Sequence, residues 1–355
     1  MQPRDFCLFP ILLLVMVSCV EVVAPPPEHA AQVRAVLETE PVLSDDDAAD
    51  DPAIWIHPRD PALSLIIGTD KRSGIEVYNL EGERVQRLEV GRPNNVDLRM
   101  LDSGPWSAIA AASNRSENTV SLFVLDQEGV LTWLPDSEIE TGLAEPYGLC
   151  MYRGEAGIQI FVNGTDGSYQ QWLIDELPPG SGADPIRFQA RLLREFSVPS
   201  QPEGCVADDE HQRLFLGVEA EGVRMVAADH RQPAELYSIA DIDGTVLVAD
   251  VEGMSLYRQG SEGFLVVSSQ GNYSYAIYDR LPPFSYRGSF IVVDHQDASL
   301  DGGDETDGLD IVSIPLGSRF PEGLLVVQDG INTLPPARQN FKLISWRDIA
   351  RALSL

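Results

Sequence analysis

Six short apolar strands recur along this chain at intervals of roughly 50 residues, and each begins at a residue that carries a side-chain oxygen. An interval of this length is typical of the four-stranded blades of a β-propeller. Because such blades surround one axis, we expect the six residues at one height, forming a ring of oxygens at one mouth of a central channel. The ring residues are Asp51, Asn95, Tyr147, Glu203, Glu252 and Asp307.

A second series of six apolar runs, each ending in a polar turn, supports the same repeat. Residues 65–74 (LIIGTDKRSG) and 214–222 (LFLGVEAEG) are examples. Helical periodicity is scarce outside residues 345–353. A β-sandwich gives no reason for a polar residue at each repeat start, so we predict an all-β, six-bladed β-propeller with a central channel and a short C-terminal helix. The strand expected around 33–43 should complete the last blade.

The N-terminal region predicts export. Residues 6–18 form an apolar run that is too short to span a bilayer and suits the hydrophobic part of a signal peptide. The run meets Cys19 in a sequence that resembles a bacterial lipobox. We therefore predict a lipoprotein-type signal peptide at 1–18, a tether at 19–32 and a six-bladed propeller domain at 33–355. A lipid anchor at Cys19 would hold the protein in the cell envelope, and secretion after conventional cleavage stays open.

Two further cysteines, Cys150 and Cys205, fall inside predicted inner strands. We interpret them as buried free thiols, with a disulfide as the alternative.

The charge of the chain restricts its partners. Its 55 acidic and 25 basic residues give a formal net charge of −30, which repels nucleic acid and anionic membranes. No protein partner is inferred, and a monomer is expected. Two like charges ~4 Å apart repel by about 1 kcal/mol in water and about 4 kcal/mol at an effective dielectric of 20. An acidic ring must therefore be partly protonated or filled by cations. Several Ca²⁺ ions, each taking 6–8 oxygen ligands, fit better than zinc, because the five His lack zinc-site spacing.

A small cationic cluster is expected beside this acidic mouth. Lys71, Arg72 and Arg115 occupy equivalent second-strand turns of neighbouring blades. Cations next to metal ions, with no obvious nucleophile, indicate an anionic substrate such as a phosphate ester. Two metal ions about 3.5–4 Å apart can orient a water for in-line attack on phosphorus, so no side-chain nucleophile is needed.

Three other acidic motifs are given structural interpretations. The run 241–245 (DIDGT) resembles the first motif of haloacid-dehalogenase phosphatases, but that fold needs a parallel α/β sheet, so we interpret it as an acidic turn. The run 301–307 resembles a calcium loop without EF-hand spacing. Residues 45–47 (DDD) are interpreted as a solvated loop.

Long motifs over nearly the whole chain, from Glu38 to the terminal helix, resemble the β-propeller phytases, the calcium-dependent bacterial 3-phytase family. They include 47–55 (DAADDPAIW), 111–118 (AASNRSEN), 268–280 (SSQGNYSYAIYDR) and 338–346 (RQNFKLISW). The resemblance implies a six-bladed propeller that hydrolyses myo-inositol hexakisphosphate (phytate), itself bound as a calcium complex, at two neighbouring phosphate pockets.

The resemblance also implies residue roles. Phosphate oxygens would be held by Lys71, Arg72 and Arg115. The catalytic calcium ions would be held by Tyr147, Glu203, Glu219, Asp50, Glu252 and Asp307. Stabilising calcium ions would be held by Asp51, Asp301, Asp329, Asn332, Glu38, Asn94, Asp250 and Gln270. The chain departs from many relatives at Thr165-Asp166, where they carry Lys-Glu, and at Ile331, where they often carry Glu.

The predicted function is hydrolysis of phosphate monoesters of phytate by a calcium-bridged water, releasing inorganic phosphate and lower inositol phosphates. Two alternatives remain open. One is a non-catalytic surface propeller that binds phosphorylated or calcium-bearing ligands, and the other is a broader phosphomonoesterase or phosphodiesterase.

Overall fold

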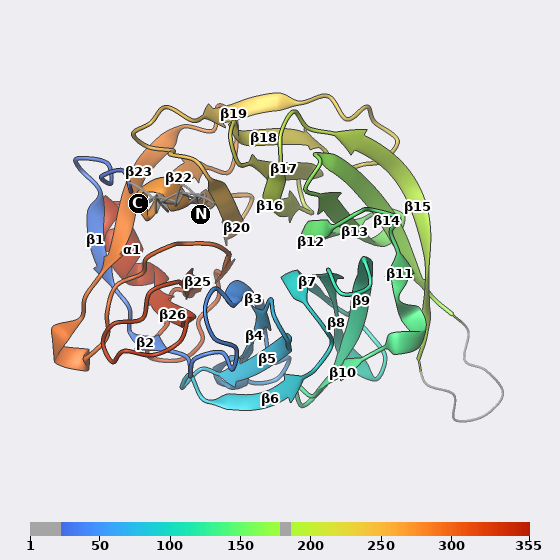
Figure 1. Ribbon diagram of the computed structural model, residues 1–355, viewed down its shortest axis with the longest axis horizontal. Helices are drawn as coiled ribbons and strands as arrows, with labels where there is room; N and C mark the ends of the chain where they lie inside the picture. The colour runs from blue at the N-terminus through green and yellow to red at the C-terminus, as the bar shows by residue number, and fades with distance from the viewer. Residues whose placement is uncertain (1–22, 178–185) are drawn as a thin grey trace, which may run out of the picture.

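The computed structural model describes residues 23–177 and 186–355, and it forms a six-bladed β-propeller around a central channel (Figure 1). Each blade is an antiparallel sheet whose first strand lies innermost. Blade one consists of β3 (Ala49–Trp55), β4 (Leu65–Asp70), β5 (Gly74–Asn79) and β6 (Arg84–Leu88). Blade two consists of β7 (Pro93–Met100), β8 (Trp106–Asn114), β9 (Thr119–Asp126), β10 (Leu131–Trp133) and the short β11 (Ile139–Glu140). Blade three consists of β12 (Pro146–Gly154), β13 (Gly157–Gly164), β14 (Ser168–Glu176) and β15 (Phe188–Ser197).

The last three blades follow the same order. Blade four consists of β16 (Pro202–Asp208), β17 (Arg213–Val218), β18 (Gly222–Ala227) and β19 (Tyr237–Asp241). Blade five consists of β20 (Val251–Gln259), β21 (Glu262–Ser269), β22 (Ser274–Asp279) and β23 (Tyr286–Val293). Blade six consists of β24 (Leu309–Val312), β25 (Leu324–Asp329) and β26 (Asn340–Ser345). The single described α-helix, α1 (Trp346–Leu353), follows β26, as predicted.

The N-terminal strands close the ring by joining two blades rather than one. Strand β2 (Leu37–Glu38) pairs antiparallel with β26 and supplies the fourth strand of blade six, which confirms the expected closure. Strand β1 (Ala31–Arg34) instead pairs in parallel with β23, as a fifth strand of blade five. Blade six has only three strands of its own, so pairing with β2 covers an otherwise open edge and ties the start of the chain to its end.

The hydrophobic core lies between adjacent blades. Trp55 and Val77 of blade one pack with Val96 and Phe123 of blade two, and corresponding clusters lie at the other blade interfaces. At blade six, Trp346 of α1 stacks on Tyr257 with ring centroids 3.9 Å apart. The fold therefore leaves the inner edges of the blades available for polar side chains.

Five of the six inner strands carry a β-bulge at the predicted ring position. The register shifts lie between Ala49 and Pro52, Pro93 and Val96, Pro146 and Leu149, Pro202 and Cys205, and Val251 and Met254. A bulge adds an unpaired residue and re-aims its side chain, and bulges are over-represented beside active sites. The repeat seen in the sequence is therefore a repeat of bulges at one mouth.

The interpretation of Cys150 and Cys205 as free thiols is wrong, because the two form a disulfide with a Cα–Cα distance of 5.7 Å. Cys150 lies on β12 and Cys205 on β16, the inner strands of blades three and four, so the bond joins adjacent blades.

The predicted signal peptide (1–18) and Cys19 lie outside the described residues. Within residues 23–177 and 186–355, no helix has the length and apolar character needed to cross a bilayer.

Candidate active site

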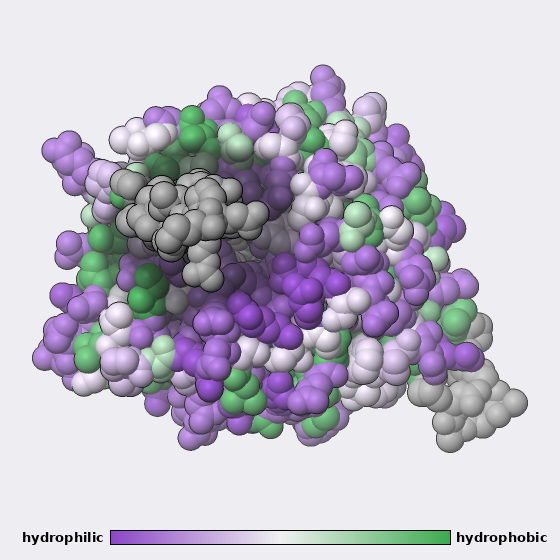
Figure 2. Space-filling view, in the orientation of Figure 1, coloured by the Kyte–Doolittle hydropathy of each residue, from purple (hydrophilic) through white to green (hydrophobic). Residues whose placement is uncertain are grey.

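A cavity of about 560 Å³ opens where the ring residues were expected. Figure 2 shows that the face viewed in Figure 1 is hollowed near its centre and is largely hydrophilic around the hollow. Starts of inner strands and turns between second and third strands both contribute to the cavity. The lining includes Asp47, Asp50, Lys71, Tyr147, Gln201, Glu203, Glu219, Asp250, Glu252, Gln270 and Asp307.

Three glutamates form the acidic centre of the cavity. Glu203 and Glu252 are buried residues on the inner strands β16 and β20, and Glu219 follows β17. One carboxylate oxygen from each lies within 4.8 Å of the other two, which is a spacing that could hold a metal ion. Gln201 donates a 2.6 Å hydrogen bond to Glu219 Oε1 and fixes its side chain.

Glycines after the ring residues allow this convergence. A Cβ on Gly148 would lie 1.8 Å from the carbonyl oxygen of Glu203, and one on Gly204 would lie 2.3 Å from that of Glu252. Each glycine therefore lets the next inner strand approach closely, and the acidic residue on that strand comes with it.

Lys71 brings the acidic residues of blades one and six together. Its Nζ lies 2.8 Å from Asp47 Oδ1, 3.1 Å from Asp50 Oδ1 and 3.4 Å from Asp307 Oδ2. Burial lowers the pKa of Lys71, but the carboxylates of Asp50, Asp307 and Asp47 outweigh burial and raise it, so the ammonium stays charged. Gln270 donates a short hydrogen bond to the other oxygen of Asp307.

Arg115 and Tyr147 lie on the other side of Lys71. The Arg115 guanidinium lies over the Tyr147 ring, 5.7 Å from its centroid, and its Nη2 donates to the Lys71 carbonyl oxygen at 3.5 Å. Burial, followed by the charge of Glu203, raises the pKa of Tyr147, which keeps the phenol neutral. Arg72 differs from these residues because its side chain is half exposed and its Nε donates to the Asp47 carbonyl oxygen.

Burial and repulsion between neighbouring carboxylates raise the pKa values of several acidic side chains in the cavity. Burial raises the pKa of Asp50 to about 6 despite the opposing effect of Lys71. Burial, aided by Glu203 and Asp250, raises the pKa of Glu219 to about 7. Burial, and then the charge of Glu203, raises the pKa of Glu252 well above its ordinary value.

The chemistry of the donor set fits a hard cation. Asp50 Oδ2, Glu252 Oε2 and Asn94 Oδ1 are buried and have no hydrogen-bond donor in the described part of the chain. Buried oxygens of this kind are ordinarily paired, and carboxylate and amide oxygens are the ligands that Ca²⁺ takes. Asn94 also donates a 2.9 Å hydrogen bond to Glu203 Oε1, so it lies with the glutamate centre.

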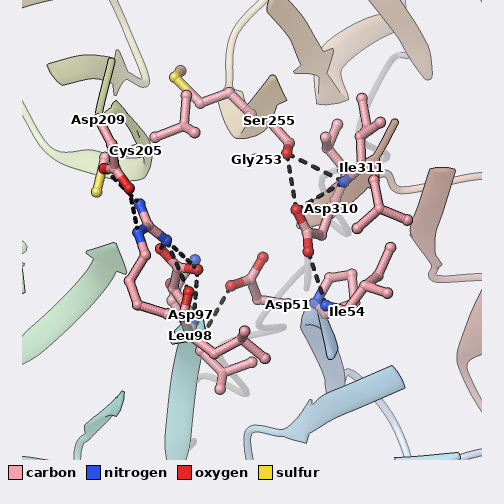
Figure 3. A pocket seen from close by; sticks show the side chains of 18 of the residues that line it. Asp51, Ile54, Asp97, Leu98, Cys205, Asp209, Gly253, Ser255, Asp310 and Ile311 are labelled. Atoms are coloured by element: carbon pink, nitrogen blue, oxygen red, sulfur yellow. Dashed lines mark hydrogen bonds and ion pairs between the residues drawn. The ribbon is translucent and has the colours of Figure 1, made fainter. Parts of the chain in front are cut away.

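Asp51 and Asn95 lie deeper, in the channel itself, so their prediction as members of the ring at the mouth is wrong. Asp50 and Asn94, one residue earlier in each strand, lie with the carboxylates of the mouth instead. A second cavity, of about 420 Å³, is lined by the inner strands of all six blades and contains Asp51, Asp97 and Asp310 (Figure 3). Asp51 Oδ2 accepts a hydrogen bond from the Val96 N–H of the next blade, and Asp310 Oδ2 accepts one from Ile54. These carboxylates satisfy N–H groups that the inner strand edges leave unpaired.

A second acidic group forms around a lysine that the sequence analysis did not identify. The Nζ of Lys342, on β26, lies 2.5 Å from Glu38 Oε2, 2.5 Å from Asp301 Oδ1 and 3.1 Å from Asp329 Oδ2. Lys342 is fully buried, so these carboxylates are the partners that its charge requires. Asn332 Oδ1 is also buried and has no donor within the described residues.

The predicted stabilising ligands therefore separate into several places. Glu38, Asp301 and Asp329 meet at Lys342, and Asp51 lies in the channel. Asn332 adjoins the Lys342 group, because the N–H of the following Thr333 donates to Asp301 Oδ2. The remaining ligands, Asn94, Asp250 and Gln270, lie with the glutamate centre or line its cavity.

The acidic turns behave as interpreted, with one addition. Asp243 Oδ1 accepts hydrogen bonds from the backbone N–H of Thr245 and Val246, so 241–245 is a turn that follows β19. Residues 45–47 are exposed, but Asp47 also pairs with Lys71 and lines the cavity. Its position immediately before the Ala48–Asp51 segment was a signal that the sequence analysis did not use.

Comparison with known proteins identifies the family. The family described as Phytase matches residues 7–354. The chain belongs to the phytase family. It is 38% identical over 338 residues to the 3-phytase of Bacillus subtilis (strain 168), covering 92% of this chain and 86% of that protein.

Two solved structures show more distant similarity to this phytase-family protein. A functionally unknown protein from Desulfotomaculum acetoxidans DSM 771 has a TM-score of 0.44 at 14% identity, with 67% of this chain and 70% of that chain covered. A protein from Lactobacillus plantarum has a TM-score of 0.48 at 13% identity, with 82% and 79% covered.

Proposed function

We propose that this protein is a calcium-dependent phytase that hydrolyses phosphate monoesters of myo-inositol hexakisphosphate. Membership of the phytase family and the 3-phytase relative support phytate as the substrate. One observation supports calcium most directly. The mouth that holds Glu203, Glu219 and Glu252 contains buried carboxylate oxygens with no hydrogen-bond donor among residues 23–177 and 186–355.

The residues of the mouth divide into two groups by charge. Glu203, Glu219, Glu252, Asp50 and Asp307 would hold calcium, while Tyr147 would contribute a neutral phenol oxygen. Bound calcium supplies charge neutralisation and lowers the pKa of a water for in-line attack on phosphorus. The other group consists of Lys71, Arg72 and Arg115, which would bind phosphate oxygens.

Each side chain then has a task that follows from its position. Lys71 and Arg115 orient the scissile phosphate and meet the charge that develops on its oxygens. Gln201 holds the carboxylate of Glu219 in one orientation. The side chains supply no phosphorylated intermediate, because the attacking group is water. The products are inorganic phosphate and lower inositol phosphates.

A substrate and metal comparison tests this proposal. Phosphate release is measured from phytate, p-nitrophenyl phosphate and a phosphodiester, each with calcium and with EGTA. We expect calcium-dependent release that is greatest from phytate. Equal activity in EGTA would contradict the role of calcium. Preference for the diester would favour the broader esterase, and phytate binding without release would favour a non-catalytic propeller.

We also propose that the protein is exported and anchored through Cys19. The Cys150–Cys205 disulfide supports export, because such bonds persist in oxidising compartments. The described part of the tether reaches the cavity rim, where Val23 lines the cavity and Ala24 N–H donates to the Gly271 carbonyl oxygen at 2.9 Å. Four residues span at most about 14 Å, so an anchor at Cys19 would keep this mouth near the membrane. Labelling of wild type but not Cys19→Ser with a radioactive fatty acid tests the anchor.

A further inference from the structure

Arg92 is a cation at the mouth of the channel that holds the candidate active site, and it has no role in the site described above. It directly precedes Pro93, the first residue of β7, at the end of the blade where the ring residues lie. Its side chain is exposed, and in residues 23–177 and 186–355 it makes no hydrogen bond or ion pair.

Backbone contacts hold Arg92 against the turn that carries Arg115. The Arg115 N–H donates to the Arg92 carbonyl oxygen at 2.9 Å, and the Arg92 N–H donates to Ser116 Oγ at 3.0 Å. Gly91 has a positive φ of 95°, and a Cβ there would lie 2.6 Å from Ser116 Oγ. The position of Arg92 next to Arg115 is therefore fixed by the fold, although its side chain is exposed.

The other flank of Arg115 is acidic. Glu145, which precedes β12, lies 3.9 Å from Arg115 Nη1 and is 46% exposed. Asp166, in the turn between β13 and β14, is exposed, and hydrogen bonds from Ser168 lower its pKa, so it stays charged at neutral pH. A Cβ on Gly164 would lie 3.0 Å from Asp166 Oδ1 and 3.5 Å from the Glu145 carbonyl oxygen, which places these two residues close together. A second phosphate on that flank would meet carboxylates rather than a cation.

We propose that Arg92 binds a second phosphate of the substrate, next to the phosphate held by Lys71 and Arg115. This inference rests on the proposed function. Two arginines on adjacent chain segments repel each other less when a polyanion lies between them, and guanidinium groups bind phosphate in a bidentate manner. Phytate carries phosphates on adjacent ring carbons, whereas a simple monoester carries one. Arg92 therefore acts on specificity, favouring inositol polyphosphates over monoesters.

The test compares Arg92→Gln with Arg258→Gln, a control at the opposite end of the channel. Arg258 is also exposed and, within the described residues, unpaired, and it lies near the end of β20. Phytate binding is measured by calorimetry in saturating calcium in the Glu219→Gln background, where turnover is slow. The kcat/KM values for phytate and for p-nitrophenyl phosphate are measured with Glu219 intact. We expect Arg92→Gln to weaken phytate binding about tenfold, equivalent to about 1.4 kcal/mol, and to reduce kcat/KM at least fivefold more for phytate than for the monoester. Arg92→Lys should retain part of the affinity.

A change in phytate affinity of less than twofold in Arg92→Gln would overturn the inference. Equal losses for both substrates would also overturn it, because they would indicate a general effect on the site. Failure of the proposed function has a different signature, which is that the wild type releases no phosphate from phytate. Calorimetry still measures the contribution of Arg92 in that case.

Discussion

Removal of the disulfide between blades three and four should destabilise the protein by a predictable amount. The bond joins residues 55 apart in the sequence, and Cys150→Ala with Cys205→Ala removes it. Loop-closure entropy is roughly −2.1 − 1.5R ln n cal/mol/K, which for this loop is about −14 cal/mol/K. At 25 °C the double variant should therefore lose about 4 kcal/mol of unfolding free energy. Truncation to alanine removes only the sulfur atoms from the core.

Activity should respond less than stability. Tyr147 and Glu203 lie on the two strands that the disulfide joins. The Glu203 carbonyl oxygen also packs on Gly148 and accepts a 3.0 Å hydrogen bond from Asn163 Nδ2, so noncovalent contacts hold the strands together in the folded state. We expect the folded double variant to keep kcat within twofold of wild type at 25 °C and to inactivate faster on heating.

Urea unfolding, followed by tryptophan fluorescence in saturating calcium, measures the effect. The comparison includes oxidised wild type, wild type reduced with TCEP, and the double variant with and without TCEP. Reduction should destabilise wild type about as much as the double substitution does, and the variant should not respond to TCEP. A loss below about 1 kcal/mol would refute the loop-closure argument. Destabilisation of the variant without destabilisation of reduced wild type would assign the loss to packing instead.

Three further predictions concern charge. The folded-state pKa values of Asp50 (about 6) and Glu219 (about 7) lie above ordinary carboxyl values, so these groups stabilise the metal-free protein at low pH and that contribution is lost as pH rises through about 6 to 7. Melting temperatures measured in EGTA should therefore fall from pH 5 to pH 8, and added calcium should reverse this trend. Glu219→Gln should reduce kcat at least 100-fold yet leave the melting temperature in EGTA unchanged or higher, because the amide removes repulsion; a parallel loss of stability would contradict this. Arg280 is buried with its Nη2 2.6 Å from Asp208 Oδ1, so Arg280→Met should lower the free energy of unfolding by about 3–5 kcal/mol. Adding Asp208→Asn should recover part of that loss, measured by urea titration.

The blade repeat and the ring were predictable because both follow from short, local sequence patterns. Each predicted ring residue lies within two residues of the start of an inner strand, and four of the six, Tyr147, Glu203, Glu252 and Asp307, line the mouth. The prediction was one residue late in blades one and two, where Asp51 and Asn95 line the channel below the mouth. A propeller repeats the same local geometry, so residues with equivalent positions in the repeat reach the same mouth. The convergence of Glu203 and Glu252 required only this rule, and Glu219 joins them from the turn that follows β17.

Features that depend on the relation between blades were not predictable in this way. Cys150 lies three residues after Tyr147, whereas Cys205 lies two residues after Glu203. The two strands carry equivalent bulges, so these cysteines lie on opposite faces of their blades, and adjacent blades pack with opposite faces together. Their pairing is therefore evident only once the two blades are known to be neighbours. Strand β1 was missed for a related reason, since its pairing with blade five depends on where blade six ends.

Lys342 was missed because its role depends on three segments that are distant in sequence. Lys342 lies between Phe341 and Leu343 in β26, a strand whose six residues are all buried, so the pattern predicts a core strand. Its charge is satisfied only when Glu38 and Asp301 reach it from other parts of the chain. A lysine between Phe341 and Leu343-Ile344 was nonetheless a usable signal, because a buried ammonium needs acidic partners.

The separation between core and site explains how one fold carries so acidic a mouth. Apolar contacts lie between blade faces, whereas the strained carboxylates lie on inner edges, where Gly148 and Gly204 bring successive strands into contact. Repulsion between Glu203 and Glu252 therefore acts on the spacing of the inner strands β16 and β20 and leaves the blade cores intact. Cations that bind there would relieve repulsion at the contacts that close the ring. By this reasoning metal binding should tighten the association between blades more than the folding of any single blade.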